Sequence, residues 1–203
     1  MQSHKLAGIT LLQNDFLQDS AFDIEGYLTN EFARSFGKKE EWAFLNGDGV
    51  SQPYGILHPT NGAEIGVTAS AADSISFDEV IRLFFSLKSE YRNHAVWVMN
   101  DETAIALRKL KDVSGNYLWR NSDDTILGKT VLISNFMPSL ASGNKAIAFG
   151  DFSYYWIVER QNLSINPIKE KYYLTDQIGY MGFEFLDGCL IRPEAIKLLQ
   201  MSA

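Results

Sequence analysis

The hydrophobic pattern near the amino end of the chain predicts one long helix. Apolar residues recur at three- and four-residue spacing from Ile24 to Phe36, which places them on one face of an α-helix. Gly47 is a typical residue just beyond a helix end. We therefore expect a helix over residues 23–46, about 36 Å long at the usual rise per residue. Charged side chains surround its middle at 38–41, so part of this helix should face solvent or a partner.

Further helices are predicted between residues 76 and 111. Ser76 and Glu79 have the spacing of a capping box, and the helical periodicity that follows them continues to about Asn93. Asn100 is a typical N-cap for another helix over 101–111. That helix carries acidic residues in its first turn and basic residues in its last turn, as the helix dipole favours.

The remaining apolar segments are short and predict strands. Stretches rich in β-branched and aromatic residues lie at 5–12, 95–99, 130–134, 145–149 and 154–159. The carboxy-terminal third, 163–199, is mostly extended and should form one long ribbon, with a turn at 186–188. Helices and strands mix without a regular βαβ repeat, so the fold class is α+β.

Composition and charge narrow the possible functions. Of the 203 residues, 46% are hydrophobic and 21% are charged, values typical of an ordered globular protein. The single cysteine, Cys189, cannot form a disulfide within this sequence, and its apolar neighbours indicate a buried, inert thiol. A net charge of −7 disfavours binding to nucleic acid, including sequence-specific binding. No run of about 18 apolar residues occurs, so no membrane partner is expected.

The glycine-rich loop 47–55 is the first candidate for chemistry. Phosphate-binding loops open a helix, whereas this loop closes one. As a calcium loop it would need a glutamate where Leu57 stands. Ser51 lacks the second glycine of a nucleophile elbow. We therefore interpret the loop as a structural turn.

Other candidate groups also favour structural interpretations. His4, His58 and His94 are isolated in sequence and complete no metal motif. The carboxylate pairs Glu40–Glu41 and Asp123–Asp124 should lie on the solvated surface. The aromatic run 152–156 has no interleaved basic residues, so core or subunit contacts are favoured over stacking on nucleic acid. We thus assign no catalytic, cofactor-binding or metal-binding residue, and we expect no cluster of strongly perturbed titratable groups in a cleft.

The order of several segments resembles the major capsid proteins of tailed bacteriophages with the Hong Kong 97 fold. The most specific signal is the helix ending at 41–49 (EWAFLNGDG) together with 52–57 (QPYGIL). This pair is similar to the family's spine helix and the glycine loop after it. Further similar segments follow in the family's order: 95–100 (AVWVMN), 107–117, 127–131 (LGKTV), 137–138 (MP) and 149–152 (FGDF).

The resemblance implies a Hong Kong 97-like α+β fold with a peripheral and an axial domain. Residues 1–66, with the spine helix at 23–46, and the ribbon at 158–186 would form the peripheral domain. Residues 67–157 and 187–203 would form the mixed α/β axial domain. The chain would then be a structural subunit of an icosahedral phage or prophage shell and not an enzyme. It would self-associate into pentamers and hexamers that enclose the genome.

The same resemblance implies partners and a location. The main partner would be the chain itself, with scaffold, portal and maturation protease as further partners. The protein would be part of the virion and would be assembled in the cytoplasm of the bacterial host. An encapsulin-like compartment shell is the alternative within the fold, and an α+β hydrolase or transferase is a remote alternative from another class.

One departure from the family concerns the amino end. Family members carry an amino-terminal arm and an extended loop before the point where this sequence starts. We therefore expect small rings instead of closed shells, with loops near 114–121 and 140–144 around the axis. Some family members join neighbouring subunits through a Lys–Asn isopeptide bond whose lysine lies on the extended loop, so no cross-linking residue is assigned in this sequence.

Overall fold

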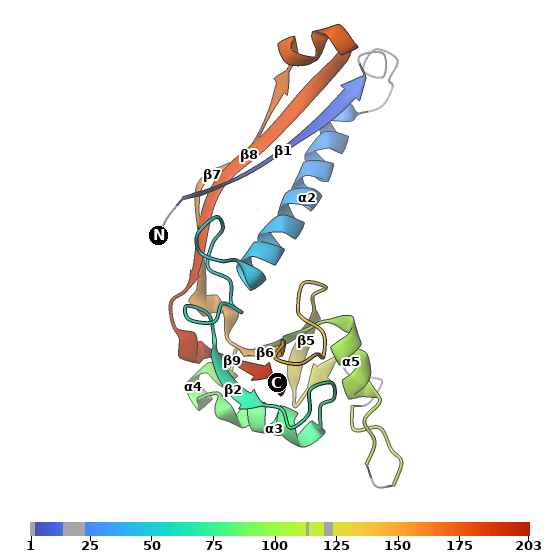
Figure 1. Ribbon diagram of the computed structural model, residues 1–203, viewed down its shortest axis with the longest axis vertical. Coiled ribbons are helices and arrows are strands. Elements are labelled where there is room, and N and C mark those ends of the chain that lie inside the picture. Colours follow the sequence, from blue (N-terminus) through green and yellow to red (C-terminus); the bar gives the residue numbers. More distant parts are fainter. Residues whose placement is uncertain (1–2, 14–22, 113, 120–123) are drawn as a thin grey trace.

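Two sheets of the described chain, joined end to end, give the molecule an elongated shape (Figure 1). The computed structural model describes residues 3–13, 23–112, 114–119 and 124–203. Its helices are α2 (Ile24–Asn46), α3 (Phe77–Ser86), α4 (Ser89–Arg92) and α5 (Asp101–Arg108). Its strands are β1 (His4–Gln13), β2 (Glu64–Thr68), β3 (Val96–Met99), β4 (Thr125–Ile126), β5 (Lys129–Ile133), β6 (Lys145–Gly150), β7 (Tyr155–Ile168), β8 (Gln177–Leu190) and β9 (Ile196–Gln200). Short 3-10 helices are η1 (Phe152–Tyr154), η2 (Glu170–Thr175) and η3 (Pro193–Ala195).

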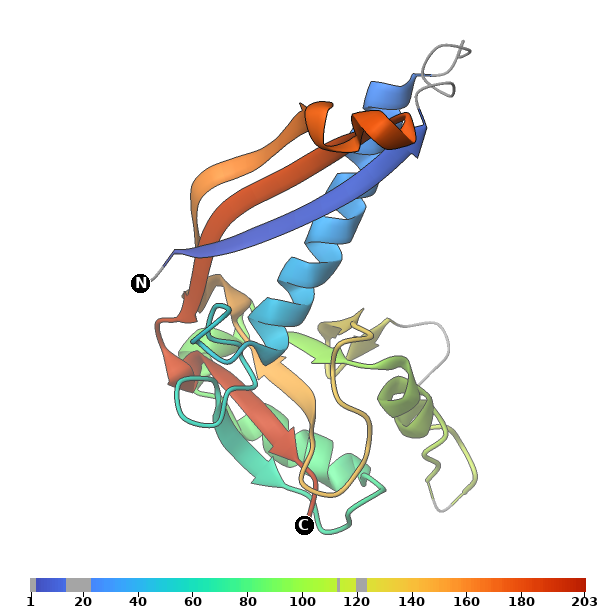
Figure 2. The ribbon, with the colours of Figure 1, turned by 45° about the horizontal axis from the view of Figure 1, so that its top comes forward.

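The upper part in Figure 1 is an antiparallel sheet of β1, β8 and β7, with β8 in the middle. Helix α2 runs along one face of this sheet, and Figure 2 shows the two side by side from a second angle. The helix buries Ile24, Leu28, Phe32 and Phe36 against apolar side chains of the sheet. Gly182 of β8 allows this close approach, because a Cβ there would lie 2.7 Å from the Phe32 ring.

The lower part is a mixed sheet in the order β2-β9-β6-β3-β5-β4. The pairs β2–β9 and β3–β5 are parallel, and the other neighbours are antiparallel. Side chains of α3 pack on this sheet and form the largest core with it. At its centre the rings of Trp97 and Phe149 stack with centroids 4.0 Å apart, and Phe84 of α3 stacks on Phe149 at 5.3 Å. The mixture of helices and both sheet types confirms the α+β class.

The long helix predicted over 23–46 is confirmed. Asp23 is the N-cap, since its carboxylate accepts a hydrogen bond from the Gly26 amide, and the helix continues unbroken to Asn46. Between Phe36 and Leu45 none of its residues is buried. The middle of the helix is therefore less buried than its two ends, as the charged residues there indicate.

The helix predicted from Ser76 to about Asn93 is wrong in its length. The capping box of Ser76 and Glu79 is present, but the helix ends at Ser86 and a separate turn, α4, follows. Leu87 between them is extended and fully buried. The guanidinium of Arg92 donates to the backbone carbonyl oxygens of Phe85, at 3.2 Å, and Leu87, at 2.7 Å. If the helix had continued, these two carbonyls would have accepted hydrogen bonds from amides of the next turn, and Arg92 supplies the donors in their place.

The helix predicted over 101–111 begins as expected but ends early. The Asn100 side chain accepts a hydrogen bond from the Thr103 amide at 2.8 Å, which confirms the N-cap. The last helical residue is Arg108. The chain then reverses, because the Leu118 amide donates to the Leu110 carbonyl and Lys111 bridges to Tyr117.

The turn predicted at 186–188 is also wrong. Strand β8 passes straight through these residues, which pair with Glu159, Val158 and Ile157 of β7. Leu186 and Asp187 are buried there. The chain reverses instead at η2, where Asp176 takes a left-handed backbone conformation. The glycine at 188 gives a turn-like sequence signal, but pairing with a long neighbouring strand decides the local structure.

Candidate functional site

The carboxyl end of α2 joins the two parts of the molecule. The carbonyls of the last helical turn accept from the loop that follows: Gly47 donates to Ala43, Ile56 to Phe44 and Leu57 to Leu45, all within 2.9 Å. Gly47 has no positive φ, but a Cβ there would lie 2.0 Å from the Pro53 carbonyl oxygen. The loop therefore folds back tightly on the helix end, and Leu45, Ile56 and Leu57 enter a core with β9 and β6.

The Asp48 carboxylate accepts hydrogen bonds from the backbone amides that a phosphate would need in this loop. Its carboxylate accepts from the amides of Val50, Ser51 and Gln52 and from the Ser51 hydroxyl, at 3.0–3.2 Å. The hydrogen bond from the Val50 amide is the main cause that lowers the pKa of Asp48. Loop 47–55 is thus closed by its own side chain, which supports the structural interpretation.

The three histidines lie apart. The His4 imidazole Nε2 is 3.7 Å from an Asp187 carboxylate oxygen. His58 accepts from the amides of Thr60 and Asn61 and contacts the Tyr54 ring, whereas His94 is exposed. Within the described ranges, no three His, Cys, Asp or Glu side chains come together in a way that could hold a metal ion.

The aromatic run at 152–156 divides between core and surface. Tyr154 packs on Tyr91 with centroids 5.3 Å apart, and Phe152 packs against the core at the joint. The Tyr155 hydroxyl donates to the Tyr54 carbonyl at 2.9 Å, and burial raises the pKa of this phenol. Trp156 is 56% exposed. The run therefore supplies internal contacts and one exposed aromatic ring.

Cys189 lies in β8 and is partly buried. Desolvation is the main cause that raises the pKa of its thiol, which keeps the thiol in its unreactive form at neutral pH. None of the helices in the described part of the chain is both long and apolar enough to cross a membrane.

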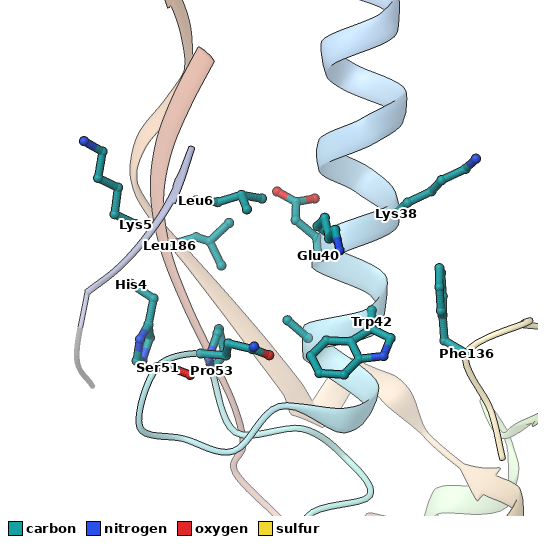
Figure 3. A pocket seen from close by; sticks show the side chains of 13 residues that line it. His4, Lys5, Leu6, Lys38, Glu40, Trp42, Ser51, Pro53, Phe136 and Leu186 are labelled. Atoms are coloured by element: carbon teal, nitrogen blue, oxygen red, sulfur yellow. The ribbon is translucent and has the colours of Figure 1, made fainter. Parts of the chain in front are cut away.

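A pocket of about 540 Å³ lies between β1, α2 and the loop after α2 (Figure 3). Its wall includes His4 and Leu6 from β1, Trp42 from α2, and Pro53 from the loop. Lys38, at the edge of this pocket, points away from the strands. The Ser51 hydroxyl in this wall donates to the Asp48 carboxylate at 3.0 Å, as part of the internal hydrogen bonding of loop 47–55.

The prediction that the Glu40–Glu41 pair lies on the solvated surface is confirmed for Glu41, which is exposed, and is wrong for Glu40. Glu41 accepts from the Ser134 hydroxyl at 2.6 Å, and Glu40 is half-buried and faces Glu184 of β8. Glu184 is only 7% exposed, and its Oε1 atom has no hydrogen-bond partner. Burial, together with the carboxylates of Glu40 and Glu159, raises the pKa of Glu184 to about 8.

Glu184 does not line the pocket described above, so the expectation that no cluster of strongly perturbed titratable groups lies in a cleft stays a prediction. Sequence reasoning missed Glu184, although a charged residue in an otherwise apolar alternating strand is a recognisable signal. In the second predicted pair, Asp124 contacts Arg108 at 3.2 Å. Its neighbour Asp123 lies outside the described residues, as do 120 and 121 of the loop expected at the axis.

Among the exposed apolar side chains, two groups lie at opposite ends of the long axis. At one end, Ile105 of α5 and Ile133 of β5 are about half exposed and line one groove. At the other end, η2 presents Tyr173 and Leu174, which are 81% and 98% exposed. Figure 1 shows that α5 and η2 lie at these two ends. Exposed apolar groups of this kind mark surfaces that contact other proteins.

A long helix beside a β-ribbon, joined by a tight loop to a second mixed sheet, defines the class of shell-forming subunits with the Hong Kong 97-like fold. A family model described as the phage capsid family matches residues 1–201. The chain belongs to the phage capsid family and is a structural capsid subunit.

Solved structures agree with this assignment. The capsid of an empty GTA particle computed with C5 symmetry matches with a TM-score of 0.88 at 36% identity, covering 98% of this chain and 74% of that one. The capsid of a native GTA particle, also computed with C5 symmetry, gives 0.89 at 36% identity, covering 99% and 73%. Microbacterium phage Oxtober96 gives 0.72 at 15% identity, covering 98% and 73%, and shares the fold. A comparison with curated proteins found no match.

Proposed function

We propose that copies of this chain associate into five- and six-membered rings that form part of a shell around a genome. The observation that carries the proposal is the 36% identity, over 98% of the chain, to a GTA capsid computed with C5 symmetry. Similarity of this extent supports the same kind of self-contact, because interfaces in a symmetric ring depend on the whole subunit shape.

The two ends of the molecule have different roles in this proposal. The sheet of β2, β9, β6, β3, β5 and β4 belongs to the axial domain, expected over 67–157 and 187–203, and β2 extends this domain back to Glu64. Helix α2 and the ribbon of β7 and β8 belong to the peripheral domain, with 1–66 and 158–186. The grouping of strands into two separate sheets supports this division.

The groove of Ile105 and Ile133 is the surface that a neighbouring copy in the ring would cover. The loops around Gly115 and Gly143 extend from the same sheet toward the ring axis. Both have glycines with positive φ and internal hydrogen bonds: the Asp112 carboxylate accepts from the amides of Ser114 and Asn116, and the Asn144 amide donates to the Ala141 carbonyl. Loops with fixed internal bonds can present the same shape in every copy.

The shell proposal extends to location and partners. The chain would be a component of the virion or particle and would assemble in the cytoplasm of the bacterial host, with scaffold, portal and maturation protease as further partners. A net charge of −7 supports a shell that encloses nucleic acid without binding its phosphates, because a negative surface gains nothing from counterion release. The protein would act by enclosing its contents and not by catalysis.

Self-association can be measured on the purified chain. Sedimentation velocity at increasing concentration is expected to show a shift from monomer to a species of five or six copies. Negative-stain images of that species should show rings. A chain that stays monomeric at concentrations of about 100 μM, well above those of typical specific complexes, would contradict the ring proposal.

A further inference from the structure

The face where α2 meets the ribbon contains a charged position within an apolar stripe. Ile24, Leu28, Phe32 and Phe36 follow one another at four-residue spacing and are buried against the sheet. The next position in this stripe is Glu40. Positions four apart lie on neighbouring parts of one helix face, so the Glu40 carboxylate follows Phe36 and is directed to the sheet, where it faces Glu184. Figure 3 shows it reaching from α2 toward Leu6.

The residue opposite Glu40 is also acidic. Side chains on alternate residues of a strand lie on one face, and Tyr180 and Gly182 of β8 already contact the helix side of the sheet. Glu184 and Leu186 continue this alternation. Glu184 is 7% exposed, and its Oε1 atom has no hydrogen-bond partner. An unpaired ionised carboxylate is costly in such a place.

The ribbon is irregular at this position. On the β1 side, Glu184 pairs in register with Leu6. On the β7 side, the register shifts twice, between Glu159 and Gln161 and between Gln161 and Ser164. Bulges of this kind bend and twist a strand. The two carboxyl groups therefore meet where the ribbon departs from regular pairing.

The charged groups around Glu184 give it no compensating partner. From α2 it faces Glu40, and from β7 it faces Glu159, and both raise its pKa. On β1, the His4 imidazole is next to Asp187. The Lys5 ammonium lies over the Phe183 and Phe185 rings, 5.2 and 5.9 Å from their centroids. His4 and Lys5, the basic residues of β1 nearest to Leu6, therefore contact other groups and not Glu184.

We propose that Glu40 and Glu184 share one proton, and that this proton clamps the spine helix to the β-ribbon as a pH-sensitive hinge. In the closed state, the protonated carboxyl of Glu184 donates to the carboxylate of Glu40. Loss of the proton leaves two negative charges face to face across a buried contact. The contact between α2 and β8 then loosens between Phe36 and Leu45, where the helix has no other buried side chain.

The sign of the pH dependence follows from the raised pKa. Between the ordinary pKa of a glutamate and the pKa of folded Glu184, the folded chain holds a proton that the unfolded chain has released. Stability contributed by this group is therefore complete below about pH 4.5, falls as pH rises, and is lost above about pH 8. An ordinary paired carboxylate would show the opposite trend.

Two measurements on the full chain test the clamp. In the first, carbon-13 NMR follows the Glu side-chain carboxyl signals with pH, and Glu184→Gln identifies the Glu184 signal by its loss. The Glu184 carboxyl is expected to titrate well above the other glutamates, and Glu40→Gln should move its midpoint toward the usual range. A Glu184 midpoint among those of the exposed glutamates would overturn the proposal.

In the second measurement, amide hydrogen exchange compares pH 6 and pH 9 after correction for the intrinsic rate. Amides at 37–44 and 182–186 should open at least about tenfold more often at pH 9, corresponding to one pKa unit or more of coupling. Glu184→Gln should remove this difference, whereas Glu170→Gln, an exposed change on the same ribbon, should keep it. An equal response in both variants would contradict the clamp.

A divalent cation bound between the two facing carboxylates is the alternative to a shared proton. If millimolar Ca²⁺ at pH 9 restores slow exchange in the wild type and Glu184→Gln abolishes that effect, the pair binds a cation and the proton clamp is wrong. Both carboxyl groups lie in one chain, so the clamp can be tested whether or not rings form. Failure of the ring experiment and failure of the clamp are therefore separate results.

Discussion

Replacing Trp97 with alanine is expected to lower the free energy of unfolding by about 3–5 kcal/mol. The indole is fully buried, stacks on Phe149 at 4.0 Å, and donates its N–H to the Ile126 carbonyl at 2.9 Å. The substitution leaves a cavity at the centre of the larger core and a buried carbonyl without its donor. Urea unfolding followed by circular dichroism measures the change.

Trp156→Ala is the matched control, because this indole is 56% exposed on β7. It should change the unfolding free energy by no more than about 0.5 kcal/mol. If Trp97→Ala does not fold, Trp97→Phe keeps most of the ring volume and should show a smaller loss of the same sign. A Trp97→Ala protein as stable as Trp156→Ala would show that the sheet core is not packed as described.

Charging the groove on α5 and β5 is expected to abolish ring formation. In Ile105→Asp/Ile133→Asp, two half-exposed apolar side chains become carboxylates. Burying the exposed half of each isoleucine in a neighbour contributes about half of the 1.5–3 kcal/mol of a fully buried side chain, so losing both weakens association by roughly tenfold to a hundredfold. Burial of the two added charges weakens it further. Sedimentation velocity measures association, and circular dichroism checks that the fold is retained.

Tyr173→Asp/Leu174→Asp is the counterpart at the far end of the ribbon. It introduces the same charge at residues that are even more exposed, but this end lies far from the groove along the long axis (Figure 1). We expect rings of this variant to remain. If the ribbon-tip variant loses rings and the groove variant keeps them, the assignment of axial and peripheral ends is reversed.

The elements that could be predicted from the sequence are those whose pattern is local. The helix over 23–46 follows from apolar spacing and its caps, and the N-cap at Asn100 from one residue type at one position. The break after Ser86 depends on Arg92 reaching back to two carbonyls, a contact that periodicity does not encode. The path of β8 through 186–188 depends on β7 and β1, because paired neighbours override a local turn signal.

The contact between Glu40 and Glu184 shows the same limit at the level of the site. In the sequence, Glu40 stands in a charged run with Lys38, Lys39 and Glu41, which indicates a solvated surface. Only the packing of α2 on β8 brings it to Glu184. The stripe from Ile24 to Phe36 indicates the helix face to which Glu40 belongs, but the strand that meets this face is distant in the sequence. Prediction of such a pair requires the register of the ribbon.

The central claim, that this chain is the shell subunit of a genome-containing particle, is tested most directly in bacteria that carry its gene. Particles are purified by density gradient after nuclease treatment, and their proteins are quantified by mass spectrometry. We predict that this chain is the most abundant protein of particles that retain nuclease-resistant DNA and show five-fold vertices in electron micrographs. A chain that stays among the unassembled proteins, or that encloses protein cargo without DNA, would contradict the account.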